Sequence, residues 1–226
     1  MDARLLNELL QARADKRAVV AATRLSDGIG KLIYPSDKSN ESWLSDAVSQ
    51  VLASDKSRVV TDPEGAEWFL NAFNPPLRLI IIGAVHIAQP VSMMAQLAGY
   101  DVTIVDPREA FASPARFPGM TVVCVWPDEA MTALAPDART AVVTLTHDPK
   151  LDDPALVVAL NSPCFYIGAL GSKKTQASRL ERLKAQGFTD ETLARIHGPI
   201  GLNIGGKSPA EIAIAIMGEI TSVLRQ

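Results

Sequence analysis

The feature that most constrains the fold is a regular alternation of apolar runs and helical patterns after the Pro75-Pro76 pair. The first run, 77–82, is almost continuously apolar, which is typical of a strand buried on both faces. Such alternation predicts an α/β fold, a Rossmann-like parallel sheet with helices on both faces. The expected strands are 77–82, 101–105, 120–125, 140–145 and 164–167, and the expected helices are 86–98, 127–134, 153–160, 172–186, 190–196 and 209–224.

The preceding part of the chain has shorter and less regular elements. A double proline neither continues a helix nor donates to a sheet, so it marks a boundary. The sequence therefore predicts a small N-terminal α+β domain at 1–73 and a Rossmann-like domain at 74–226. The elements expected in the first domain are helices at 2–13 and 41–53 and strands at 17–25, 29–35, 58–61 and 67–73.

Composition excludes several classes of protein. The net charge of −3 gives no global attraction to nucleic acid. Cys124 and Cys164 lie in apolar runs and are expected to be small buried hydrophobes, which indicates a reducing compartment. The longest central apolar run contains Arg78 and His86 and is too short for a membrane span, and the amphipathic start does not read as a signal peptide. We expect a cytoplasmic protein, and the spacing of its three histidines predicts no metal site.

In an open parallel sheet, ligands bind beyond the carboxyl ends of the strands. Gly83 follows the first strand of the second domain and opens an incomplete dinucleotide fingerprint with His86. Val85 occupies the place of the glycine that lets the backbone approach a pyrophosphate, so we expect it to obstruct that approach. A Rossmann-like turn that binds no dinucleotide is at least as good an interpretation.

Charged side chains follow the next strands. Asp106 lies about 20 residues beyond Gly83, which matches the acid that contacts a ribose in this fold, and Arg108 adds a cation beside it. Arg116 belongs to a loop that could cover the site and contact an anion. After a later strand, His147 and Asp148 could serve acid–base chemistry or hold a ligand, or could equally be structural, whereas Asp152 and Asp153 are expected to cap the next helix.

The glycine-rich turn at 168–174 is the best candidate for phosphate binding. Cations in the first turn of a helix oppose the helix dipole unless an anion sits there. A second glycine-rich loop, 197–207, suggests close approach of the backbone to a ligand beside Asn203. The candidate residues are Gly168, Gly171, Ser172, Lys173 and Lys174 in the first loop and Asn203 in the second.

Five segments together carry a specific resemblance, which covers about residues 77–224. They are GAVHIAQ, DPREAFASPARFPG, LTHDPKLDDPAL, YIGALGSKK and RIHGPIGLNIGGKSPAEIAIAIMGEI. In order and spacing they resemble the XdhC/CoxI family, the xanthine dehydrogenase accessory factors. The resemblance implies a chaperone that binds the molybdenum cofactor, as molybdopterin or its cytosine dinucleotide, and that has no catalytic residues of its own.

The same resemblance implies partners and shows two departures. The family protects the cofactor, helps a cysteine desulfurase sulfurate it, and hands it to the apo-enzyme of a molybdenum hydroxylase; a homodimer is a further expectation. The family pattern reads Gly-Ala-Gly-His where this chain has Val85. Many relatives carry a Ser-Gly-Gly-Cys segment in the N-terminal domain, whereas residues 1–73 contain no Cys, which excludes cysteine ligation of molybdenum from that domain.

Two alternatives compete with the chaperone. An NAD(P)-dependent oxidoreductase is supported by Gly83 and Asp106 and opposed by Val85. A nucleotide-sensing regulatory module would bind a nucleotide without chemistry.

Overall fold

A computed structural model describes residues 2–35 and 42–225. These residues form two compact units that divide between Pro76 and Leu77. The predicted domain boundary lay a few residues earlier, after residue 73. Each unit is described by itself.

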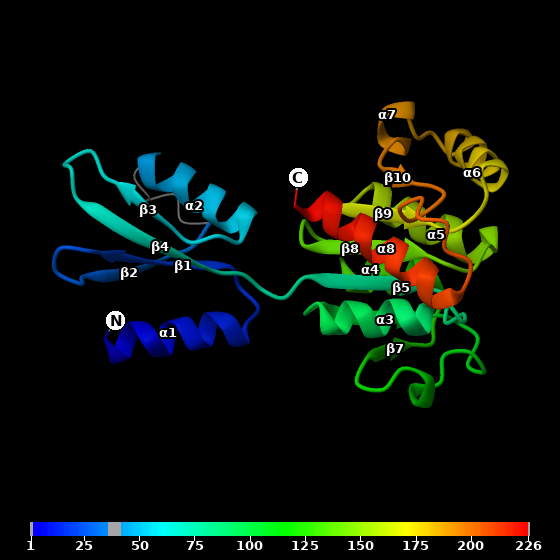
Figure 1. Cartoon of the computed structure of the whole chain (residues 1–226), viewed down its shortest axis with the longest axis horizontal. Coiled ribbons are helices and arrows are strands. Elements are labelled where there is room, and N and C mark those ends of the chain that lie inside the picture. Colours follow the sequence, from blue (N-terminus) through cyan, green and yellow to red (C-terminus); the bar gives the residue numbers. More distant parts are fainter. Residues whose placement is uncertain (1, 36–41, 226) are drawn as a thin grey trace. The chain divides into compact units, whose positions relative to one another are not determined.

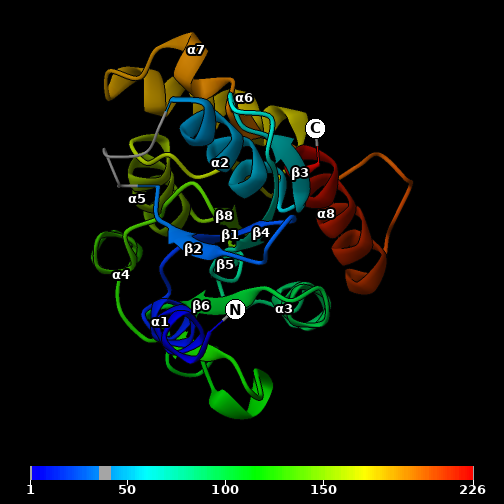
Figure 2. The same cartoon turned by 90° about the vertical axis from the view of Figure 1, so that its left-hand side faces the viewer.

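The first unit is an antiparallel sheet with a helix on each face (Figures 1 and 2). Strand residues alternate between faces, so neighbouring residues pack on different helices. Val19 of β1 packs with Leu9 and Ala12 of α1, whereas Val20 packs with Val48 of α2. The strand order is β2-β1-β4-β3, and the elements are α1 (Ala3–Ala14), β1 (Val19–Arg24), β2 (Gly30–Ile33), α2 (Ser42–Ser54), β3 (Arg58–Thr61) and β4 (Glu67–Phe73).

The second unit is a six-stranded parallel sheet in the order β10-β9-β8-β5-β6-β7. The chain winds outward from β5 in one direction through β6 and β7, then returns to β8 and winds the other way. Its strands are β5 (Arg78–Ile82), β6 (Asp101–Val105), β7 (Thr121–Val123), β8 (Thr140–Thr144), β9 (Tyr166–Ala169) and β10 (Ile196–His197). The direction reverses between β5 and β8, and this switch point is where Rossmann-like folds bind ligands.

Helices cover both faces of this sheet. Leu79 and Ile81 of β5 pack toward α3 and α8, and Ile80 and Ile82 pack toward α4, α5, α6 and α7. This alternation explains why the β5 run is apolar on both faces. The helical elements are α3 (Ala88–Leu97), the short η1 (Pro114–Arg116), α4 (Pro127–Leu134), α5 (Pro149–Leu160), α6 (Lys173–Ala185), α7 (Asp190–Leu193) and α8 (Pro209–Leu224).

The predicted fold class is confirmed, but three expectations were wrong. Helix α5 starts at Pro149 because Asp148 caps it, so Asp152 and Asp153 are buried inside the helix and do not cap it. The helix expected at 190–196 ends at Leu193, since its last residue pairs with β9 as strand β10. Cys164 is buried as expected, but Cys124 is exposed beyond the end of edge strand β7. Within the described residues, no helix combines the length and apolarity that a membrane span needs.

Candidate functional site

The turns after β5 and β8 meet at the switch point of the sheet. Gly83 has a φ of +103°, and a Cβ added there would lie 2.4 Å from Cγ2 of Thr146. Two independent features therefore require glycine at this position, the backbone conformation and the close approach of the Thr146 side chain. Val85 is half-buried against the core of α3 and α8, and His86 is exposed.

Asp106 ties the Gly83 turn to the start of the next loop. Its fully buried carboxylate accepts four hydrogen bonds, from the backbone N–H of Ala84 at 2.8 Å and from the N, Nε and Nη2 of Arg108 at 2.7–3.0 Å. Burial alone would raise the pKa of Asp106, but these hydrogen bonds outweigh it and lower the pKa. Four donors fill the lone-pair positions of one carboxylate. The ribose contact of Asp106 stays a prediction, and a ribose hydroxyl would have to displace one of these donors.

The loop after β6 folds back on the Gly83 turn. Arg116 donates from Nη1 to the carbonyl oxygens of Ala84 at 2.8 Å and Phe111 at 2.6 Å. Arg108 lies over the Phe111 ring, with Cζ 4.4 Å from its centroid. Both arginines thus hold the loop in place, and their use as anion contacts stays a prediction.

The turn after β8 presents His147 and Asp148 to solvent. His147 has a φ of +62°, a left-handed conformation uncommon outside glycine. The Asp148 carboxylate accepts from the Lys150 N–H at 3.0 Å and so caps α5, while the Asp148 N–H donates to Thr146 Oγ1 at 3.0 Å. Asp148 therefore already has a structural role as a cap.

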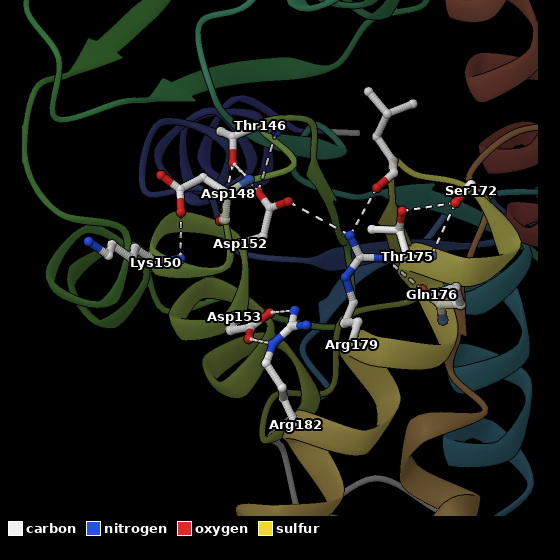
Figure 3. Close-up of polar contacts among 11 residues, drawn as sticks. Thr146, Asp148, Lys150, Asp152, Asp153, Ser172, Thr175, Gln176, Arg179 and Arg182 are labelled. Carbon is white, nitrogen blue, oxygen red and sulfur yellow. Dashed lines mark hydrogen bonds and ion pairs between the residues drawn. The ribbon is translucent and has the colours of Figure 1, made fainter.

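The turn after β9 has the geometry of a helix start, with Ser172 beside Thr175 in the first turn of α6 (Figure 3). Ser172 caps α6 by accepting from the Thr175 N–H at 3.1 Å, and Lys173 and Lys174 occupy the first two helical positions, both exposed. At a helix start the first N–H groups have no intrahelical acceptor, so they favour an anion. Gly171, with a φ of +152°, precedes the cap.

Gly168 lies in strand β9 and was wrongly expected in the turn. A Cβ on it would lie 2.4 Å from Cδ1 of Ile200, so the glycine lets the loop after β10 pass close over the strand. The Ile200 N–H donates to the carbonyl of Ala169 at 3.1 Å and holds this loop at the strand end.

A recess of about 380 Å³ brings Lys173 and Asn203 together. Its wall is the glycine-rich loop after β10, with Ile212 and Ala215 of α8 behind it. The predicted residues of the β5 and β6 turns do not line it. The residues that do are Lys173, Pro199, Ile200, Gly201, Leu202, Asn203, Ile204, Gly205, Gly206, Ile212 and Ala215.

Sequence reasoning missed the side chains that bind the loop wall of this recess from behind. Glu219 of α8 accepts from the Gly201 N–H at 2.8 Å and from the hydroxyl of Tyr166, and its other oxygen lies 3.5 Å from Nδ1 of His197. The His197 ring stacks on Tyr166 with 4.7 Å between centroids. Burial and the neighbouring carboxylate raise the pKa of Tyr166, which keeps its hydroxyl protonated as a donor. These residues lie on separate elements of the chain, so no local sequence pattern predicts that they are partners.

Comparison with known proteins agrees with this architecture. Residues 79–220 match the family model described as the XdhC Rossmann domain. The Escherichia coli molybdenum cofactor insertion chaperone PaoD is 31% identical over 160 residues, which cover 69% of this chain and 44% of PaoD. The Escherichia coli protein YqeB is 30% identical over 155 residues, covering 69% of this chain and 29% of YqeB.

A solved structure extends the likeness in fold to both units. A crystal structure of a xanthine dehydrogenase from Bacillus halodurans superposes with a TM-score of 0.73 and 22% identity, covering 99% of this chain and 66% of that one. The matched part of this chain spans less than half the length of PaoD or YqeB.

Proposed function

Because this chain belongs to the XdhC family, we propose that it binds the molybdenum cofactor and delivers it to a molybdenum hydroxylase of the xanthine dehydrogenase type. PaoD is named as a chaperone for insertion of that cofactor, which supports the general role. The proposal includes protection of the cofactor, its sulfuration with a cysteine desulfurase, and release to the apo-enzyme. A homodimer that shields the cofactor is a further part of it.

The observation that carries the proposal is the recess that joins Lys173 to Asn203. It combines a cation at a helix start with a glycine-rich wall and apolar side chains such as Ile204. A ligand with a phosphate at one end and a flat ring system suits such a recess, because small-molecule sites are largely apolar with a few fixed polar groups.

The chemistry of the donors fits a pterin phosphate. Lys173 and Lys174 and the first N–H groups of α6 would hold the phosphate, and Asn203 would offer an amide to the ring. The molybdenum would supply the redox chemistry of the client enzyme, whereas the residues here bind and orient. In the dinucleotide form, Asp106 at the Gly83 turn would contact the nucleotide end only after giving up one of its present hydrogen bonds.

The proposal is tested by purifying the chain without oxygen from a host that makes the cofactor. Molybdenum is measured by mass spectrometry and pterin by fluorescence after oxidation, on one sample. We expect near-stoichiometric pterin in the wild type. Each of Lys173→Ala and Lys174→Ala should weaken retention by about tenfold to a hundredfold, since a hydrogen bond to a charged group contributes about 1.5–3 kcal/mol.

Lys56→Ala is the matched control, because Lys56 is an exposed lysine of the first unit, outside both turns. Its pterin content should equal that of the wild type. Absence of pterin from the wild type, even with added free cofactor, would refute the proposal and direct the search to NAD(P) and other nucleotides.

A further inference from the structure

Asp152 of α5 and Arg179 of α6 form a buried charged pair between the helices that follow β8 and β9 (Figure 3). Each residue is 1% exposed, and Arg179 Nη2 lies 3.8 Å from Asp152 Oδ2. Burial raises the pKa of Asp152 and lowers the pKa of Arg179, because both charged forms have lost water. Apolar residues in place of such a pair are often tolerated or stabilising, so packing alone does not explain its presence.

The hydrogen bonds of the pair lead outward to the two ligand-facing turns. On one side, Asp152 Oδ1 accepts from the Thr146 hydroxyl at 2.7 Å. On the other, Arg179 Nη2 donates to the carbonyl oxygen of Leu170 at 2.9 Å, and Nη1 donates to Gln176 Oε1 at 2.6 Å. One connected path thus runs from Thr146 through two buried charges to the residue that precedes the Gly171 turn.

A neighbouring ion pair on the same two helices has no such hydrogen bonds to the turns. Arg182 binds Asp153 through two hydrogen bonds, at 2.6 and 2.9 Å, and the Arg182 side chain is 38% exposed. Among the described contacts, neither partner bonds to the turn after β8 or β9. Figure 3 shows the two pairs side by side, with only Arg179 directed to the turns. The difference indicates that the pair of Asp152 and Arg179 does more than join α5 to α6.

Thr146 also fixes a third turn. Its methyl group occupies the space into which a Cβ on residue 83 would project. The position of Thr146 therefore depends on the Gly83 turn at one side and on Asp152 at the other. The three turns that carry most of the candidate ligand contacts are joined through this one side chain.

We propose that Asp152 and Arg179 are positioning residues that hold the turn at 170–173 in a fixed relation to the turn at 146–148. A ligand phosphate at Lys173 and a second ligand group near His147 would then meet a preformed site. This ligand role rests on the proposed function, whereas the mechanical coupling between the turns does not.

The coupling is tested without ligand by Thr146→Val in the full chain. The substitution keeps the shape of the side chain and removes the hydroxyl, which donates to Asp152 and accepts from the Asp148 N–H. We expect amide hydrogen exchange of Leu170, Thr175 and Gln176, whose N–H groups donate to Thr144 and Ser172, to become about fivefold faster. This is the change that corresponds to losing one ordinary hydrogen bond, the one from Thr146 to Asp152. Thr146→Ser, which keeps the hydroxyl, should restore slow exchange.

Asp153→Asn is the control for general loosening of α5 against α6. It should leave exchange of Leu170, Thr175 and Gln176 unchanged, and all three variants are compared at peptides from β5 and β6. Unchanged exchange in Thr146→Val, or equal acceleration in Asp153→Asn, would overturn the coupling.

The ligand role has its own measurement. Retention of molybdopterin by Thr146→Val should fall several-fold, with Thr146→Ser near the wild type. Faster exchange with unchanged retention would overturn the positioning role. If the wild type retains no pterin, the proposed function and the ligand role both fail, and the exchange result alone decides the coupling.

Discussion

Gly83→Ala is a sensitive test of how the switch point is built. The new Cβ would lie 2.4 Å from Thr146 Cγ2, on a backbone with a φ of +103°. The backbone strain costs about 1–2 kcal/mol, and the steric overlap costs about 1–3 kcal/mol. Reduced entropy of the unfolded chain offsets about 0.4–1 kcal/mol. We expect a net loss of about 3 kcal/mol in the free energy of unfolding of the second unit.

The two contributions can be separated with Thr146→Ser, which deletes Cγ2 and keeps the hydroxyl bonded to Asp152. In that background, Gly83→Ala should lose only the backbone contribution, so the double-mutant cycle should show a coupling of about 1–3 kcal/mol. The assay is amide hydrogen exchange of β5 and β8 in the full chain, with β1 and β4 as an internal comparison. A coupling below about 0.5 kcal/mol, the usual error of additivity, would refute the close contact.

Three further outcomes follow from single contacts. Asp106→Asn should weaken the fall of the free energy of unfolding at acid pH. The stabilisation by the carboxylate is complete above a pH of about 3.8 and is lost as the pH falls through the lower pKa of the folded state. Urea titrations that find the same acid dependence in the variant would contradict the hydrogen-bond network of Asp106. Cys124 should react with iodoacetamide in the folded protein, whereas Cys164 should react only after unfolding, since burial raises the pKa of its thiol. Equal alkylation rates of the two cysteines in mass spectrometry would disprove this. Ser208→Ala should lower the free energy of unfolding by about 1 kcal/mol, because Ser208 accepts from the Glu211 N–H in a capping box. Thermal unfolding measures this loss, and a loss near zero would show that the cap does not stabilise the protein.

The elements that could be predicted are those whose signal is local. The β5 run is apolar because each face of the strand meets its own helix layer. Helix α8 was predicted with its observed bounds because Ser208, Pro209 and Glu211 mark its start within four residues. These features need no knowledge of distant parts of the chain.

What could not be predicted depends on contacts between distant elements. Strand β10 exists only because Ile196 and His197 pair with β9. Asp152 and Asp153 resemble helix caps in the sequence, but arginines on α6 pair with them inside the fold. Gly168 resembles a loop glycine, and its role as a packing surface becomes visible only when Ile200 lies over it.

Helix α8 has a consequence for the order in which the chain acquires its structure. Ala213, Ile216 and Ile220 cover the same face of the sheet as Leu79 of β5, although the two elements lie at opposite ends of the second unit. During synthesis, that face of β5 is covered only in part, by α3, until α8 has been made, whereas the first unit has all its strands before β5 is made. The second unit is therefore the part of the nascent chain that depends on protection from aggregation until α8 is complete.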